Sequence, residues 1–318
     1  MASITLSRRA ALQALGLAIA SPFSRAWAQT ADSSLNFLAV GDWGRDGAFH
    51  QADVAARMGE TAQAIKSRFV ISVGDNFYDD GVTAVNDPKW KTSFEEVYAA
   101  PSLQTPWYVA LGNHDYRGDA QAQLDYAKTS ARWRMPSRWY GLQQTAPDGA
   151  TVDFIFLDTS PMCREYYKDG AKTVKVAGQD VAAQMAWFEK TLAASKADWK
   201  IVVGHHPIYS GLDPANPAES GGYAELQASL DPLLQRYRAP LYLNGHDHDL
   251  QHVFKGATHY VCTGAGSKMR DKCDVVGSDF CSLQSGFTAL SLNRQVLRVA
   301  YRDYTGAELR VVDIPRSA

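Results

Sequence analysis

Short apolar runs alternate along the chain with longer segments whose apolar residues recur at helical spacing. Leu35–Val40 is an apolar run of the kind that forms a buried strand. Ala48–Lys66 has the periodicity of an amphipathic helix. Further strands are expected over Phe69–Val73, Trp107–Leu111, Phe154–Leu157, Lys200–Val203 and Leu241–Leu243, and further helices over Pro88–Tyr98, Val181–Leu192 and Tyr223–Tyr237. Strands that alternate with helices favour an α/β fold with crossover connections.

The pattern changes after Thr258, where most of the remaining chain is strand-like. It ends in hairpin-like runs at Ala289–Leu292 and Val296–Tyr301. A chain of 318 residues is long enough for one large domain or two ordinary ones. The sequence contains no internal repeat, low-complexity tract or long linker, so we expect a single domain over residues 29–318.

The first 28 residues contain the three parts of an export signal in the expected order. Ser7–Leu12 carries a twin-arginine pattern, Ala14–Ala20 is a short apolar run, and Ala26–Ala28 matches an A-x-A cleavage site. The alternative for this segment is a frayed amphipathic helix. We expect residues 1–28 to be a signal peptide read by the twin-arginine export machinery, which carries proteins already folded. The mature chain would then be periplasmic or secreted, without a membrane anchor.

Composition and charge exclude some classes of partner. Apolar residues make up 46% of the chain and charged residues 21%, which is ordinary for a globular protein. The formal net charge of −2 gives no indication of a nucleic-acid groove or a membrane-binding patch. We therefore expect no nucleic-acid partner.

Four cysteines in an exported chain permit disulfides. Cys273 and Cys281 bracket a short polar loop and are the expected pair. Cys262 lies in a strand-like run and is expected to be a buried free thiol, and Cys163 has no obvious partner. Sequence alone does not fix the connectivity.

Five glycine-led polar segments each follow a predicted strand. They are Gly41–Gly44, Gly74–Tyr78, Gly112–Asp115, Gly204–Pro207 and Gly245–His248. Each one alone is an ordinary turn motif, although G-H-x-H also indicates a metal site, because alternate residues of an extended segment face the same way. Ligands of open α/β sheets bind outside the carboxyl ends of the strands. The five segments together predict one polar site there.

These five segments resemble the motifs of the calcineurin-like metallophosphoesterases. Tyr78 narrows the resemblance to the purple acid phosphatases, and the chain is most similar to their small, mammalian-type, tartrate-resistant members. The resemblance runs from about Leu35 into the 260s and thins out after Met269. It implies a metallophosphatase four-layer α/β/β/α sandwich with two mixed sheets, whereas periodicity alone supports only α/β.

The resemblance also implies seven metal ligands. Asp42, Tyr78 and His248 would bind a first metal, Asn113, His205 and His246 a second, and Asp75 would bridge the two. It implies Fe(III) in the first site and Fe(II), Zn(II) or Mn(II) in the second. The chemistry agrees, because a phenol with a pKa near about 10 needs a strongly acidic ion to bind as phenolate. Imidazole ligands suit a divalent ion.

Two further histidines are expected to act in catalysis. In the family the histidine matching His114 contacts the substrate and helps to protonate the leaving group; a role in orienting a ligand is the alternative. His206 follows a proposed ligand and either reaches the phosphate or only packs. Two metals can clamp the attacking and leaving oxygens, and a metal-bound hydroxide then serves as nucleophile, so no protein nucleophile is needed.

The sequence departs from the small animal enzymes in two places. Pro214 stands near the position of another family histidine, and Lys268 and Arg270 follow Gly264–Gly266 where the family has an acidic residue. We expect this pair to bind a phosphate or a second anionic group. The polar segment Arg164–Gly178 aligns with a loop that covers the family active site, and we expect it to be mobile and to restrain access; an ordinary surface loop is the alternative.

The expected function is an acid phosphatase that hydrolyses phosphate monoesters at a dinuclear Fe(III)–M(II) centre. Its partner would be a small phosphate-ester substrate, and the resemblance implies a monomer. One alternative is a metallophosphodiesterase or nucleotide hydrolase of the same superfamily, against which Tyr78 argues. Another is a non-catalytic dinuclear-iron redox or metal-binding protein, against which the complete ligand set and His114 argue.

Overall fold

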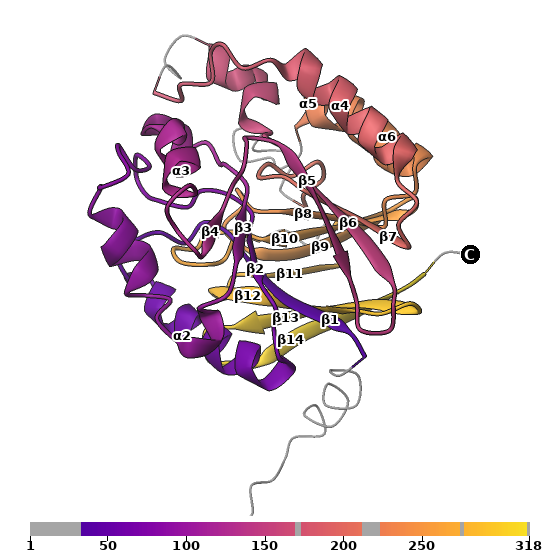
Figure 1. Ribbon diagram of the computed structural model, residues 1–318, viewed down its shortest axis with the longest axis horizontal. Helices are drawn as coiled ribbons and strands as arrows, with labels where there is room; N and C mark the ends of the chain where they lie inside the picture. Colours follow the sequence, from indigo (N-terminus) through magenta and orange to yellow (C-terminus); the bar gives the residue numbers. More distant parts are fainter. Residues whose placement is uncertain (1–32, 169–172, 212–222, 274–276, 317–318) are drawn as a thin grey trace, which may run out of the picture.

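The computed structural model describes residues 33–168, 173–211, 223–273 and 277–316, so the predicted export signal and Pro214 lie outside the described residues. Within these ranges the chain forms two seven-stranded sheets, shown in Figure 1. The first sheet has the order β14 (Glu308–Pro315), β13 (Val296–Asp303), β12 (Gly286–Leu292), β1 (Leu35–Val40), β2 (Val70–Ser72), β3 (Trp107–Val109), β4 (Trp133–Arg134). The second has the order β11 (Phe280–Ser282), β9 (Leu250–Lys255), β10 (Thr258–Thr263), β8 (Leu241–Asn244), β7 (Trp199–Val203), β6 (Thr151–Phe156), β5 (Tyr140–Thr145).

Both sheets are mixed, as expected. In the first, β1 to β4 run parallel and β12 joins β1 antiparallel. In the second, β6, β7, β8 and β10 run parallel, while β5 and β9 are antiparallel to their neighbours. This arrangement matters for function because the ends of parallel strands place their following loops at one edge of a sheet.

Aromatic side chains fill the space between the sheets. Phe37 of β1 stacks on Phe69 with ring centroids 5.0 Å apart, and Phe154 of β6 meets both rings edge-on at 5.3 and 5.5 Å. All three are buried. Sheets pack face to face when such side chains interdigitate. The resulting core holds the loop-bearing strands of both sheets in a fixed relation.

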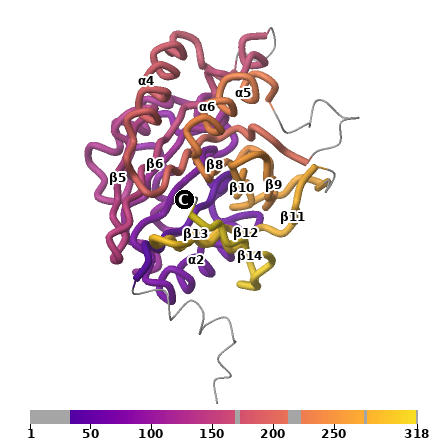
Figure 2. The backbone as a smooth tube through the Cα atoms, turned by 90° about the vertical axis from the view of Figure 1, so that its right-hand side faces the viewer, coloured from indigo at the N-terminus to yellow at the C-terminus, as the bar shows by residue number. Residues whose placement is uncertain are grey.

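Helices cover the outer faces. α2 (Gln51–Ile65) packs on β1 and β12 of the first sheet, while α4 (Val181–Ala194), α5 (Ala224–Ser229) and α6 (Asp231–Arg236) lie over the second, on the opposite side of the molecule in Figures 1 and 2. α3 (Ala120–Tyr126) lies near β4. Short helical turns occur at Trp90–Glu95, Pro101–Leu103, Asp115–Arg117, Ser160–Met162 and Arg164–Tyr167. The helices and sheets make the expected four-layer α/β/β/α sandwich. None of the described helices is long and apolar enough to cross a bilayer.

Three helix predictions need correction. Tyr223–Tyr237 is not one helix but two, because Pro232 occupies the first turn of α6, where a proline is tolerated but cannot continue a preceding helix. The helix predicted from Ala48 begins at Gln51, since Phe49 and His50 adopt left-handed backbone angles. Pro88–Tyr98 contains only a six-residue π-helical segment.

The cysteine predictions agree with the structure. Cys273 and Cys281 form a disulfide, while Cys262 and Cys163 are buried and free.

Candidate metal centre

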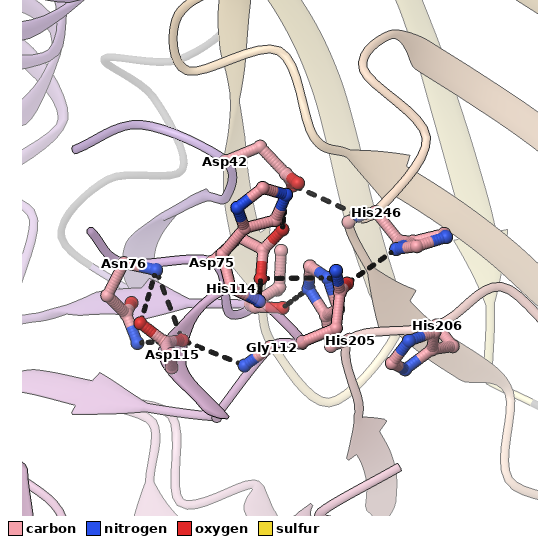
Figure 3. Close-up of polar contacts among 12 residues, drawn as sticks. Asp42, Asp75, Asn76, Gly112, His114, Asp115, His205, His206 and His246 are labelled. Atoms are coloured by element: carbon pink, nitrogen blue, oxygen red, sulfur yellow. Dashed lines mark hydrogen bonds and ion pairs between the residues drawn. The ribbon is translucent and has the colours of Figure 1, made fainter. Parts of the chain in front are cut away.

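Each predicted loop follows a strand end and brings its polar side chains to the same place. Asp42, Asp75 and Asn113 follow β1, β2 and β3 of the first sheet, and His205 and His246 follow β7 and β8 of the second. Figure 3 shows Asp42, Asp75, His205 and His246 close to one another, with His114 beside Asp75. The site therefore depends on the packing of both sheets.

Strained backbone accompanies three of these residues. Asp42, Asp75 and His246 have left-handed φ angles of 60°, 48° and 69°. Such conformations cost on the order of 1–3 kcal/mol for a residue with a side chain, and they cluster at functional sites. Each of these residues lies in a loop that follows a strand, in contact with the other donor side chains.

The first cluster of donors surrounds the hydroxyl of Tyr78. Its oxygen lies 3.0 Å from Asp42 Oδ1, 3.0 Å from Asp75 Oδ2 and 2.9 Å from His248 Nε2. His248 Nε2 is also 3.4 Å from Asp42 Oδ1. Oxygen donors predominate in this cluster, which suits a hard cation.

The second cluster is richer in nitrogen. Asn113 Oδ1 lies 3.2 Å from His205 Nε2 and 3.0 Å from His246 Nδ1. Asp75 joins the two clusters, because its Oδ1 is 3.4 Å from His205 Nε2 while its Oδ2 faces Tyr78. The structure thus brings together all seven residues for which metal ligation was predicted.

Hydrogen bonds behind the second cluster fix the orientation of its imidazoles. His205 Nδ1 lies 2.9 Å from the carbonyl oxygen of Val73, which can only accept, so this nitrogen carries a proton and Nε2 faces Asn113. Tyr223 Oη donates to Glu165 at 2.7 Å and lies 2.9 Å from His246 Nε2, so it accepts the proton of that nitrogen. Nδ1 of the neutral His246 ring then presents a lone pair to the amide oxygen of Asn113. Acceptors that face one another favour a cation between them.

The pKa shifts of the clustered side chains also favour a bound cation. Burial raises the pKa of Tyr78 well above 10, and the charges of Asp42 and Asp75 raise it further, so the phenol keeps its proton without a cation. Burial lowers the pKa of His205, but Asp75, Asp42 and the carbonyl of Val73 together outweigh that effect and raise it to about 9. In the absence of a metal the cluster thus takes up a proton, and a cation can replace that positive charge. The donor set fits the two metal ions that the family pattern implies.

His114 lies at the edge of the first cluster. Its backbone N–H donates to Asp75 Oδ1 at 2.7 Å, its Nδ1 lies 2.5 Å from the carbonyl oxygen of Asp79, and its Nε2 is 3.9 Å from Asp75 Oδ2. The side chain keeps 17% of its surface exposed. His114 therefore combines contact with the centre and access from solvent.

His206 has a different position. Its ring is fully buried, with Nδ1 2.8 Å from Thr159 Oγ1 and Nε2 2.8 Å from Tyr166 Oη. In Figure 3 it lies below His246, away from Asp75. Both ring nitrogens contact protein groups, and these contacts favour the packing interpretation over direct phosphate binding.

Sequence reasoning missed a buried network that supports the loop carrying Asn113 and His114. Asp115 Oδ2 accepts from the backbone N–H of Gly112 at 2.8 Å, and its two oxygens also accept from Asn76 and Gln123. Asp115 and Asn76 both belong to the glycine-led segments, but no role was predicted for either. Gln123 on α3 carried no local signal, since its role depends on the fold.

A cavity of about 520 Å³ lies beside the centre. His246 and His248 line one part of it, and Lys268, Arg270 and Lys272 line another. Arg270 forms ion pairs with the buried residues Asp247 and Asp249, so its guanidinium is already engaged. A second cavity, of 490 Å³, lies away from these loops beside Tyr108 and is mainly apolar. The cavity beside the histidines therefore adjoins the candidate metal centre, whereas the apolar cavity does not.

The segment expected to cover the site is described only in part. Residues 169–172 lie outside the described residues, and its predicted mobility remains a prediction. The turn Arg164–Tyr167 contributes Glu165 and Tyr166, which contact Tyr223 and His206.

Comparison with known proteins gives the same family. The model for calcineurin-like phosphoesterases matches residues 35–250. The chain is 42% identical to "Purple acid phosphatase 17" of Arabidopsis thaliana, over 74% of this chain and 70% of that protein. It is 34% identical to human "Tartrate-resistant acid phosphatase type 5", over 92% and 94% of the two chains. Among solved structures it is similar to GAP50, described as the anchor in the inner membrane complex of Plasmodium, with a TM-score of 0.78, 26% identity and 90% of both chains covered. The chain therefore belongs to the calcineurin-like phosphoesterase family and, within it, to the purple acid phosphatases.

Proposed function

We propose that this protein is an acid phosphatase that hydrolyses phosphate monoesters at a dinuclear metal centre. The observation that carries the proposal is the convergence of seven donor side chains, with Asp75 between an oxygen-rich and a nitrogen-rich cluster. The relatives named as acid phosphatases support it.

Asp42, Tyr78 and His248 would hold Fe(III), and Asn113, His205 and His246 would hold Fe(II), Zn(II) or Mn(II). Asp75 would contact both ions. Bound there, the two metals would supply Lewis acidity toward the phosphoryl group and the attacking water. Tyr78 supports the ferric assignment, because its phenol ionises only beside a strong cation.

The remaining residues of the site would orient the ester and move a proton. His114 is the side chain placed to donate a proton to the leaving oxygen, since its Nε2 is close to Asp75 and partly exposed. Its Nδ1 is held by the carbonyl oxygen of Asp79, so this nitrogen carries a proton and the ring cannot turn freely. Arg45 lies 3.6 Å from the centre of the Tyr78 ring and pairs with Asp79, which fixes this side of the site.

The phosphodiesterase alternative makes a different prediction. A ferric tyrosinate centre favours a monoesterase in this superfamily, so Tyr78 in contact with Asp42 and His248 argues for the monoester reaction. Turnover of para-nitrophenyl phosphate against bis-para-nitrophenyl phosphate at acid pH decides between them. A higher kcat/KM for the diester would overturn the monoesterase proposal.

The non-catalytic alternative has support from one comparison, because GAP50 shares this fold and is described as an anchor. The fold therefore does not decide activity. The complete donor set and the exposed edge of His114 favour a working enzyme. A metal-loaded protein that hydrolyses neither ester would establish the non-catalytic alternative.

We also propose that the chain is exported folded by the twin-arginine route, to the periplasm or beyond, and acts as a monomer on small phosphate esters. Export after folding suits a site whose donors come from two sheets. Replacement of Arg8 and Arg9 by lysine should leave the protein in the cytoplasm on cell fractionation. Equal export of this variant would contradict the proposed route.

A further inference from the structure

A hydrogen-bonded pair outside the seven donors controls the orientation of His246. Tyr223 Oη lies 2.9 Å from His246 Nε2 and donates to Glu165 Oε1 at 2.7 Å. A carboxylate can only accept, so the single tyrosine proton goes to Glu165 and the tyrosine oxygen accepts from His246. His246 Nε2 must then carry the ring proton.

The position of this proton decides what the other ring nitrogen, Nδ1, presents to the second cluster. With its proton on Nε2, a neutral His246 has its lone pair on Nδ1, which lies 3.0 Å from Asn113 Oδ1 within the second cluster. The opposite tautomer would turn an N–H toward that cluster and prevent metal binding there. Partners that fix the tautomer of a metal-binding histidine are known to govern metal affinity.

The pair joins segments that are distant in sequence. Glu165 belongs to the helical turn Arg164–Tyr167, and Tyr223 immediately precedes α5, 58 residues later. A second bond, from the backbone N–H of Arg164 to Glu225 Oε1 at 2.8 Å, ties the turn to the same helix. Tyr223 is partly buried, and its hydroxyl contacts both Glu165 and His246.

We propose that Glu165 and Tyr223 are positioning residues that set the affinity of the second site for its divalent ion. The inference rests on the proposed dinuclear function. It adds that the turn Arg164–Tyr167 contributes to metal binding. Without the Glu165–Tyr223 bond, the tyrosine proton can be donated to His246 Nε2. That bond favours the tautomer with its proton on Nδ1, which cannot bind a metal through Nδ1.

The test uses the purified holoprotein, stripped of its divalent ion with its iron retained, and titrated with Zn²⁺ against a chromophoric chelator. Tyr223→Phe and Glu165→Ala are each expected to weaken Zn²⁺ binding by roughly 10- to 100-fold. Glu165→Gln should retain most of the affinity, because its amide oxygen still accepts the tyrosine proton. Tyr167→Phe is the matched control, since that hydroxyl lies in the same turn and bonds the carbonyl oxygen of Pro161 instead.

Iron content and the visible absorption band should be unchanged in every variant, and excess Zn²⁺ should restore phosphatase activity to Tyr223→Phe. If Tyr223→Phe does not fold, Glu165→Ala carries the test, because Glu165 is partly exposed. Wild-type Zn²⁺ affinity in both Tyr223→Phe and Glu165→Ala, or an equal loss in Tyr167→Phe, would overturn the inference while leaving the proposed function intact. A wild-type protein that binds no Zn²⁺ and hydrolyses no ester would overturn both.

Discussion

The hydroxyl of Tyr78 lies 2.9 Å from Nε2 of His248, although 170 residues separate them in the chain. Tyr78 follows a strand of the first sheet and His248 follows a strand of the second. The metal centre is thus assembled across the interface between two sheets. Changes that shift one sheet against the other should disturb metal binding before they unfold the protein.

His114 should be essential for turnover and not for metal binding. His114→Gln keeps the backbone N–H that holds Asp75 but removes the imidazole beside it. We expect kcat to fall by roughly 10²- to 10⁴-fold, the range for loss of a general acid. Metal analysis should show unchanged occupancy. Loss of metal together with activity would assign His114 to ligand support instead.

His206 should behave in the opposite way. Its two ring nitrogens contact Thr159 and Tyr166 in a fully buried environment. His206→Leu leaves those polar groups without partners, so we expect destabilisation by about 1–3 kcal/mol for each group in chemical denaturation. A selective fall in kcat at unchanged stability would instead support the predicted catalytic role.

Gly112 should be indispensable because of its distance from Asp75. A Cβ atom at this position would lie 2.2 Å from Asp75 Oδ1 and 2.3 Å from its backbone nitrogen. Gly112→Ala must displace the carboxylate that joins the two clusters, so we expect loss of both metals by elemental analysis. Gly141→Ala is the control, since its Cβ would meet only the Trp187 ring at 3.9 Å. Full metal occupancy in Gly112→Ala would show that Asp75 is not a required ligand.

Arg270 should contribute to stability rather than to substrate binding. It pairs with Asp247 and Asp249, and burial raises the pKa of Asp249 to about 7 even though Arg270 opposes that effect. Removing one partner of a buried pair costs about 3–5 kcal/mol. Arg270→Ala should therefore unfold more easily above pH 7, and less so at acid pH, where the aspartates can protonate.

Comparison of Arg270→Ala with Lys268→Ala separates a structural role of Arg270 from an anion-binding role. Lys268→Ala removes an exposed cation from the same cavity without breaking that pair. If Arg270→Ala raises KM for every phosphate ester while its stability is unchanged, the predicted anion-binding role is correct and the structural role is wrong.

His259 should make the protein sensitive to acid. Burial and the neighbouring His252 lower the pKa of His259 from 6.5 to about 4. Because the folded pKa lies below the unfolded one, the unfolded chain binds the proton more tightly, and stability is lost as the pH falls from about 6.5 toward 4. His259→Gln should flatten the fall in melting temperature over this interval. Identical pH profiles for the variant and the wild type would contradict this cause.

The sequence predicted the architecture well where local pattern and tertiary environment agree. The apolar run Leu35–Val40 is a buried central strand, and each glycine-led loop lies where its strand end placed it. β5 was missed because it is an edge strand whose exposed positions, Gly141, Gln143 and Thr145, leave no continuous apolar run. β4 was missed because two residues carry no periodicity.

The same limit applies to the site. The predicted ligands stand in conspicuous motifs, and all seven converge. The partners that orient these ligands do not stand in such motifs. Tyr223, Glu165 and Gln123 come from a helix start, a turn and a helix face, where nothing in the local sequence indicates a function. The position of His206 was likewise undecidable, since only the fold shows what its ring nitrogens contact.

The measurement that tests the proposed function most directly is a visible absorption spectrum of the exported protein together with metal analysis, repeated on Tyr78→Phe. We predict a purple band, iron and a second metal at about one each per chain, and loss of the band in the variant, since Tyr78 contacts the iron-site donors Asp42 and His248. A colourless wild-type protein that holds two zinc or manganese ions would contradict the ferric tyrosinate centre and favour the diesterase alternative.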